Sequence, residues 1–367
     1  MLLFTQLVKR LIFLAIREDG MVRIKDIAKA ANVSTATVSY VINERGNISS
    51  DTRKKVLKVI KELNYQPNNV AKSLKINKTN TIGVVVEDIT VFSSPEIING
   101  INESADENGL SILLTNLRVH RRIGNNFGEF DKCRTDVKAA VEELVSRQVD
   151  GIIYVGVHNR DLTGLIELDK PVVFSYCSSR TENQFSVNYD DELAAFEATN
   201  YLIGLGHQKI ALISGLIDSI PAHGRFLGYY KALVSHNLEF NPEYVKTGDW
   251  EYLSGYTMAK ELLSVKNRPT AILAMNDLMA GGVFEACRES GVRVPEDLSV
   301  IGFDNRECSF YFTPRLTTVN LPLNEIGMKS MEILVGAIRK SDIPETDVKL
   351  KCNLVERESV MEYSTVR

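Results

Sequence analysis

The chain has 367 residues, 44% hydrophobic and 25% charged, which is the composition of a globular protein too long for one ordinary core. Its five cysteines are scattered without a CxxC pair, which argues against a disulfide framework and a zinc site and favours a reducing compartment. The net charge of −4 conceals an asymmetry. Residues 21–80 carry 12 Lys and Arg against 4 Asp and Glu, whereas residues 81–367 carry 28 against 41, so a basic module that meets a polyanion is attached to an acidic body.

The first 20 residues hold the best candidate for a membrane or export signal, the run "LIFLAI" at residues 11–16. Six residues are far fewer than the roughly 20 that a membrane span needs. The run is also short for a secretory signal, and "REDGMVR" is a poor cleavage region. We interpret residues 1–20 as an upstream extension that is not native, with Met21 as the natural start, and we expect a cytoplasmic protein that does not contact membranes.

Residues 21–80 contain three segments with helical character. In "IKDIAKAA", residues 24–31, apolar side chains recur at i, i+3, i+4 and i+7, which predicts a helix. Ser34 is placed to cap a second helix that ends near residue 43. A third helix is predicted over residues 50–64, with an apolar stripe of Val56, Leu57, Ile60 and Leu63. Two short helices joined by a tight turn and braced by a third are typical of a helix-turn-helix domain.

The outer face of the second helix consists of small polar and methyl groups and one tyrosine: Thr35, Ala36, Thr37, Ser39 and Tyr40. Such groups suit base edges and phosphates in a major groove. The third helix adds positive charge for the DNA backbone, with Arg53, Lys54, Lys55, Lys58 and Lys61. The alternative interpretation is a small helical domain whose charges are merely solvated.

Residues 23–85, from "RIKDIAKAANVSTATVSYVIN" to "NKTNTIGVV", resemble the headpiece of the lactose-repressor (LacI/GalR) family of transcription regulators almost without interruption. The resemblance implies DNA-binding roles for six residues of the helix-turn-helix. Thr35, Ala36 and Tyr40 would read bases, and Ser34, Thr37 and Asn43 would hold phosphates.

The same resemblance identifies "NNVAKSLK", residues 68–75, with the hinge helix that folds when two subunits meet on DNA. It implies that Leu74 wedges into a central base step of the minor groove, with Ala71 and Lys75 beside it. Such a wedge unstacks the bases at a cost of a few kcal/mol and bends the duplex, which brings other contacts within reach.

From residue 81 onward, short aliphatic strands alternate with helical segments. The first set is "TIGVVVED", "LSILLTN", "DGIIYVG" and "KPVVFSY", and the second is "QKIALISG", "YVKTGDW", "TAILAMND" and "LSVIGFDN". Near-continuous aliphatic strands between helices predict parallel sheets that are covered on both faces. We therefore expect two doubly wound α/β lobes, with a ligand between them at the carboxyl ends of the strands.

The family resemblance continues through the body in phrases such as "GHQKIALISG", "RPTAILAMNDLMAGGVFEA" and "GVRVPEDLSVIGFDN". It implies a periplasmic-binding-protein-like body behind the all-α headpiece. The expected divisions are 21–66 for the DNA-binding headpiece, 67–80 for the hinge helix and linker, 81–188 plus 322–349 for effector-binding lobe 1, and 189–321 plus 350–362 for lobe 2.

Candidate ligand contacts follow the strands. Lobe 1 offers Asp88, Phe92, Ser93 and Ser94, although its loop "DITVFSSPEI" departs from the family pattern, and family positions in lobe 2 imply Arg225, Trp250, Asn276 and Asp304. Arg and Asp make charge-assisted hydrogen bonds to adjacent hydroxyls, and an indole face stacks on the apolar side of a sugar ring. We expect Asp277 to cap the following helix, which leaves Asn276 for the ligand. The basic stretch Arg118–Arg122 is interpreted as a solvated loop, with contact to an anionic ligand or partner as the alternative.

No catalytic constellation emerges: GxSxG, GxxxxGK[ST] and HExxH are all absent from the sequence. We therefore expect a homodimeric repressor rather than an enzyme, with no cofactor, that binds a pseudo-palindromic operator DNA and a small effector, a sugar first. One alternative keeps the regulator but changes the effector to a purine, a nucleoside or a phosphoprotein. Another is an exported sugar-binding uptake receptor, for which residues 1–20 would be a signal and the basic module would remain unexplained.

Overall fold

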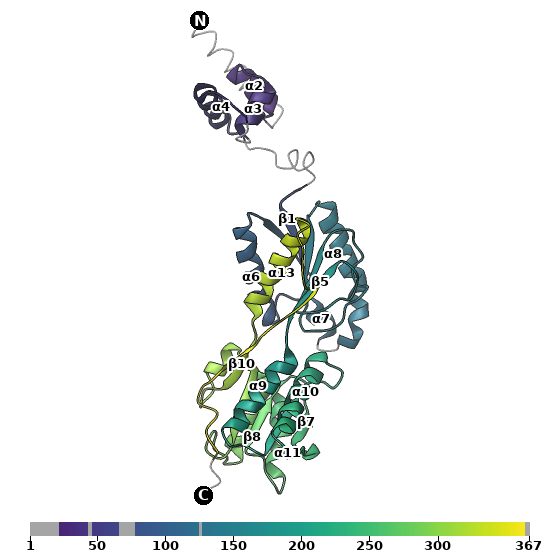
Figure 1. Ribbon diagram of the computed structural model, residues 1–367, viewed down its shortest axis with the longest axis vertical. Helices are drawn as coiled ribbons and strands as arrows, with labels where there is room; N and C mark the ends of the chain where they lie inside the picture. Colours follow the sequence, from purple (N-terminus) through teal and green to yellow (C-terminus); the bar gives the residue numbers. More distant parts are fainter. Residues whose placement is uncertain (1–21, 43–45, 66–77, 125–126, 364–367) are drawn as a thin grey trace. The chain divides into compact units, whose positions relative to one another are not determined.

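The structure of the chain is a computed structural model that describes residues 22–42, 46–65, 78–124 and 127–363. The chain divides into two compact units, Met1–Thr79 and Asn80–Arg367 (Figure 1). We call the first unit the headpiece and the second the body. Within the described residues, every helix is too short or too polar to cross a membrane.

The headpiece contains three helices, α2 (Ile24–Ala31), α3 (Thr35–Ile42) and α4 (Ser50–Glu62). The Ser34 hydroxyl accepts a hydrogen bond from the Thr37 N–H at 3.0 Å, so it caps α3 as its sequence predicts. The three helices meet over a core that includes Ile27 and Val38, both fully buried. In α4, however, the prediction for Leu57 is wrong: this side chain is 49% exposed, because Val56 and Val59 occupy the buried face.

Lobe 1 of the body is built on a six-stranded sheet with the order β11-β5-β4-β3-β1-β2, in which all paired strands are parallel. Its strands are β1 (Thr81–Val86), β2 (Ser111–Asn116), β3 (Gly151–Val155), β4 (Val172–Ser175), β5 (Gln184–Tyr189) and β11 (Asp347–Leu350). Its helices are α6 (Ser93–Glu107), α7 (Val119–Ile123), the 3-10 helix η1 (Phe127–Cys133), α8 (Arg134–Ser146) and α13 (Leu323–Ile338).

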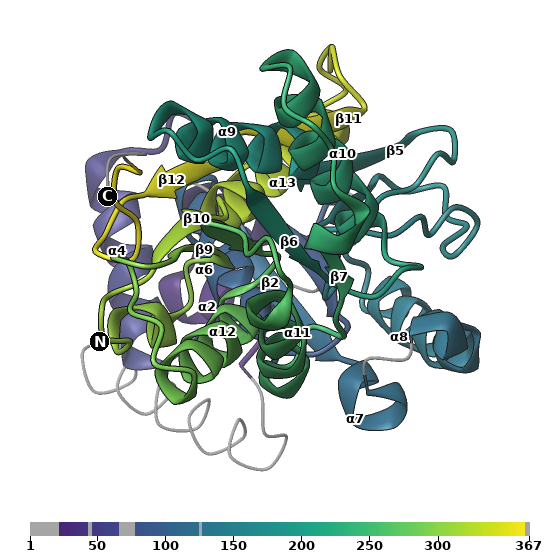
Figure 2. The ribbon, with the colours of Figure 1, turned by 90° about the horizontal axis from the view of Figure 1, so that it is seen from below.

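Lobe 2 repeats the design with the order β12-β10-β9-β8-β6-β7, in which β12 is antiparallel to β10. Its strands are β6 (Ile210–Ser214), β7 (Val245–Thr247), β8 (Ala271–Ala274), β9 (Ser299–Asp304), β10 (Thr317–Asn320) and β12 (Asn353–Val355). Its helices are α9 (Asp191–Gly204), α10 (Ile220–Ser235), α11 (Tyr252–Ser264) and α12 (Asp277–Glu289), with the 3-10 helices η2 (Pro242–Tyr244) and η3 (Glu307–Phe310). Helices α9 and α10 pack against each other on one face of the sheet, and α11 and α12 pack against each other on the opposite face (Figure 2).

Two-faced burial explains the aliphatic strands. In β1, Ile82, Val84 and Val86 point into the core beside α6, whereas Val85 points into the second core, to which α8 contributes. The predicted fold of two doubly wound α/β lobes is confirmed.

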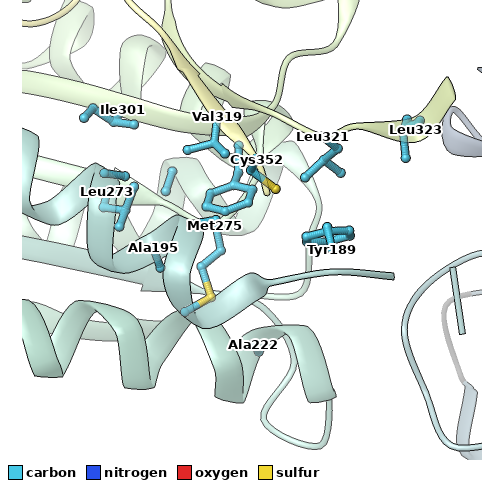
Figure 3. Packing of buried hydrophobic residues seen from close by; sticks show 14 of the residues in the cluster. Tyr189, Ala195, Ala222, Leu273, Met275, Ile301, Val319, Leu321, Leu323 and Cys352 are labelled. Carbon is cyan, nitrogen blue, oxygen red and sulfur yellow. The ribbon is translucent and has the colours of Figure 1, made fainter. Parts of the chain in front are cut away.

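The chain passes between the lobes three times, after β5, after β10 and after β11. Apolar side chains of these crossings, including Tyr189, Leu321 and Cys352, are buried in the same cluster as the core of lobe 2 (Figure 3). The connections between the lobes are therefore packed segments.

Candidate functional site

The strand order of both lobes directs their loops to one place. In lobe 1 the chain leaves β1 toward β2 on one side and leaves β3 toward β4 on the other, and β6 and β8 have the same relation in lobe 2. At such a switch point the loops diverge and leave a crevice beyond the carboxyl ends of the strands. A cavity of about 1080 Å³, here called the cleft cavity, lies between the lobes at these ends.

Five of the eight predicted ligand residues line the cleft cavity. They are Phe92 from lobe 1 and Arg225, Trp250, Asn276 and Asp304 from lobe 2. These residues are far apart in the sequence, and the two switch points bring them together. The size of the cavity suits a small organic ligand, since such sites usually span about 300–1,000 Å³.

The other three predicted residues, Asp88, Ser93 and Ser94, lie outside the wall of the cavity. The carboxylate of Asp88 accepts hydrogen bonds from the hydroxyl and N–H of Thr90 and from the N–H of His120, and these bonds lower its pKa although burial opposes the shift. It thus shapes the loop after β1. Ser93 is fully buried in the first turn of α6, as is Ser94. The geometry does not support a direct ligand contact for any of these three residues.

Arg225 is the centre of a buried polar network. Its Nε donates to Asp191 at 2.8 Å, one Nη donates to the Tyr189 hydroxyl at 2.8 Å, and the other donates to the Met275 carbonyl. Asp304 lies 4.0 Å from the guanidinium, and burial raises the pKa of its carboxyl in spite of this cation. Arg225 is thus held rigidly by four partners, with its guanidinium at the cavity wall.

The backbone of Trp250 adopts an uncommon conformation. Its φ is +76°, which is an outlier for a bulky side chain and persists where the surroundings impose it. Its carbonyl accepts a hydrogen bond from the Asn276 side chain at 2.8 Å. Its indole lies against Gly215, where even a Cβ atom would come within 2.0 Å of the ring. These contacts fix the indole at the wall of the cavity.

The prediction that Asp277 caps α12 is wrong. The side-chain oxygen of Asn276 accepts from the N–H of Met279 at 2.8 Å, so Asn276 caps α12 and Asp277 is the first helical residue. Asp277 is instead buried behind the wall, where its carboxyl accepts from the Thr318 hydroxyl at 2.6 Å and from the Arg306 N–H at 2.7 Å. Burial, and then the nearby charge of Asp304, raise the pKa of Asp277 to about 8.

Sequence reasoning missed three contributors to the wall. Tyr176 is a buried lining residue and forms a ring pair with Tyr189. Arg160 follows β3 and forms an ion pair with fully buried Glu87, which also accepts from the Tyr154 hydroxyl at 2.7 Å. Arg306 comes two residues after Asp304. The strand-end position of Arg160 and Arg306 was a usable signal, since ligands bind beyond the carboxyl ends of parallel strands.

The rim of the cavity on lobe 2 is acidic. Asp218, Asp249 and Glu251 are exposed there, and the latter two flank Trp250. On lobe 1, His158 is neutral because burial, and then the charge of Arg160, lower its pKa to about 3. His120, from the basic stretch that we interpreted as a solvated loop, also lines the cavity.

The second candidate site is the outer face of α3 in the headpiece. Ser34, Thr35, Ala36 and Tyr40 are exposed and Thr37 is half-buried, with Tyr40 50% exposed. Val38 and Val41 point into the core, so these polar groups are available to a partner. Four further predicted DNA contacts, Asn43, Ala71, Leu74 and Lys75, lie outside the described residues.

Comparison with known proteins identifies the family of both parts of the chain. Residues 23–68 match the family of bacterial regulatory proteins, lacI family, and residues 199–360 match the periplasmic binding protein-like domain. The chain is 34% identical over 346 residues to the HTH-type transcriptional repressor PurR of Aliivibrio fischeri (strain MJ11), which covers 93% of this chain and 99% of that repressor.

Two solved structures are similar in fold. The lac repressor dimer bound to operator and the anti-inducer ONPF superimposes with a TM-score of 0.74 and 30% identity, covering 93% of this chain and 99% of that one. A complex of the transcriptional regulator CelR with cellobiose gives a TM-score of 0.60 and 27% identity, covering 92% and 99%. All three proteins are named as repressors or transcription regulators.

Proposed function

Because the chain belongs to the lacI family of bacterial regulatory proteins, we propose that it is a DNA-binding transcriptional repressor controlled by a small uncharged ring compound, a sugar first. The ligand occupies the cleft cavity, and the outer face of α3 reads the operator. The observation that carries the proposal is the pairing of Arg225 and Asp304 beside an indole on the wall of one cavity. Adjacent hydroxyls suit the charged pair, and the apolar side of a sugar ring suits Trp250.

The charges of the wall support an uncharged ligand. Arg225 and Arg160 each have a buried carboxylate partner, Asp191 and Glu87 respectively. The rim of the cavity on lobe 2 also carries the exposed carboxylates Asp218 and Asp249. A phosphorylated ligand would meet repulsion there, since like charges at a few ångströms repel. The phosphoprotein alternative is correspondingly weaker.

A purine base or nucleoside is the second candidate. A relative that is 34% identical is named PurR. The cavity also has an aromatic residue on each lobe, Phe92 and Trp250, and two aromatic faces suit a flat base. On the other side, the CelR structure holds cellobiose. The two ligand classes are separated by direct measurement.

Ligand and DNA are coupled in this proposal through the three crossings between the lobes. A ligand that prefers one arrangement of the lobes shifts the population toward it, and operator affinity changes by the same factor as ligand affinity changes on DNA. In a homodimer, two α3 helices would enter successive major grooves of a pseudo-palindromic operator. This role places the protein in the cytoplasm, where the DNA is.

The test is a titration that uses the sole tryptophan as its probe. Because Trp250 lines the cavity, its fluorescence reports occupancy without a label. The panel holds monosaccharides, cellobiose, purine bases, nucleosides and sugar phosphates, and the anisotropy of operator fragments selected from a random pool is measured with each compound. We expect saturable quenching by one uncharged class and a change of DNA affinity with the same compound. Quenching by sugar phosphates alone, or DNA affinity that no bound compound alters, would contradict the proposal.

A further inference from the structure

One side-chain contact spans the cleft cavity from lobe to lobe. The guanidinium carbon of Arg306, which follows β9 in lobe 2, lies 3.9 Å from the ring centroid of Phe92, which precedes α6 in lobe 1. Both side chains line the cavity. A guanidinium at this distance from an aromatic ring is held by cation–π attraction.

Arg306 is anchored on its own lobe. Its Nε donates to the carboxylate of Asp304 at 3.2 Å, and its backbone N–H donates to Asp277 at 2.7 Å. The two preceding residues, Asp304 and Asn305, both have positive φ, at +101° and +53°, so Arg306 follows a sharp turn at the end of the strand. The guanidinium is therefore a fixed group, and its side chain is 24% exposed.

The position of the guanidinium is one that a ligand needs. It covers the ring of Phe92 and it occupies an oxygen of Asp304, whereas a ring compound in the cavity would use the aromatic face for stacking and the carboxylate for a hydroxyl or N–H. In this structure a planar donor satisfies both groups. A ligand must therefore compete with Arg306 for them.

We propose that the contact of Arg306 with Phe92, here called the clasp, holds the two lobes together. The effector must displace the Arg306 guanidinium from this contact to bind. The inference rests on the proposed function for its effect on ligand binding, but the contact itself can be tested without a ligand. Arg306 thereby sets the threshold concentration of effector. It also links ligand entry to release of a contact between the lobes.

The first test uses the ligand-free protein and a double-mutant cycle of Phe92→Leu and Arg306→Met. Urea unfolding followed by Trp250 fluorescence gives the equilibrium constant for each variant. We expect a coupling factor of about two to five in that constant, the range for an exposed cation–π pair. Additive effects of the two substitutions would overturn the clasp, whatever the effector is.

The second test measures binding of whichever panel compound quenches the wild type. Arg306→Met keeps much of the aliphatic side chain but removes the charge and the planar donors. It should tighten the dissociation constant by about two- to fivefold, since the ligand no longer displaces a cation–π contact. The matched control is Arg315→Met, which removes the same charge from an exposed position on lobe 2 away from the cavity.

The outcomes separate the two proposals. Tighter binding in Arg306→Met with an unchanged Arg315→Met supports displacement. Unchanged or weaker binding in Arg306→Met overturns it, because Arg306 would then be neutral or a direct ligand contact. If no compound binds the wild type, the proposed effector class is wrong. The double-mutant cycle by urea unfolding still shows whether Arg306 and Phe92 interact.

Discussion

Asp277 provides the sharpest test of the electrostatics behind the cavity wall. Its two carboxyl oxygens accept from neutral donors only, the Thr318 hydroxyl and the Arg306 N–H, and the side chain is fully buried. In Asp277→Asn the amide oxygen faces the Arg306 N–H. The amide NH2 then donates to the Thr318 hydroxyl, which rotates to accept. We expect this variant to fold and to be more stable than the wild type in alkaline buffer.

The magnitude follows from proton linkage. In the unfolded chain the carboxyl titrates at about pH 4, whereas its pKa in the folded protein is raised to about 8. Between these values the folded state keeps a proton that the unfolded state has lost, so the free energy of unfolding falls by about 1.4 kcal/mol per pH unit. The stabilisation is complete below the unfolded pKa and is lost as the pH rises through the folded pKa. From about pH 5.5 to about pH 8 the wild type loses about 3 kcal/mol by this route.

The assay is urea unfolding of both proteins across that pH range, followed by the fluorescence of Trp250, which reports on the same lobe. Subtracting one curve from the other removes titrations that both proteins share. The stability of Asp277→Asn relative to the wild type should rise by about 3 kcal/mol from the acidic to the alkaline end. A difference that stays constant with pH would refute the reasoning, since Asp277 would then be ionised throughout.

Three further predictions concern the buried network and DNA binding. Arg225→Met leaves the buried carboxylate Asp191 without its cation and should lower the free energy of unfolding by about 3–5 kcal/mol, measured by urea unfolding near neutral pH; a loss within about 0.5 kcal/mol would show that the network relaxes freely. Lys58→Gln, at a side chain 76% exposed, should reduce the slope of log affinity against log salt by about one unit in DNA titrations, and an unchanged slope would mean that this lysine faces only solvent. Leu74→Ala should weaken binding to the operator more than binding to random DNA in competition anisotropy, and equal losses would contradict the wedge implied by the family resemblance.

The periodicity of apolar residues predicted much of the secondary structure of this protein. The aliphatic strands identify two covered parallel sheets because nearly every side chain of a strand covered on both faces is buried, so the strand reads as a continuous apolar run. Ser34 identifies the start of α3 because a hydroxyl that caps a helix acts within three residues. The exposed face of α3 was predictable in the same way, because the helical period decides which side chains share a face. The prediction fails at Leu57, since an apolar stripe formed by four side chains does not reveal which of its edges faces the core.

What tertiary structure decided is the partnership of buried charges. Arg225 pairs with Asp191 across 34 residues of sequence, Arg160 pairs with Glu87 across 73, and Arg306 reaches Phe92 on the other lobe. Nothing periodic marks such pairs, because their members lie on segments that meet only when parallel strands bring their carboxyl ends to one edge. For the same reason the partner of buried Asp277, the Thr318 hydroxyl of β10, emerged only from the folded structure. A sequence specifies which groups are costly to bury, and the fold alone selects the group that compensates each of them.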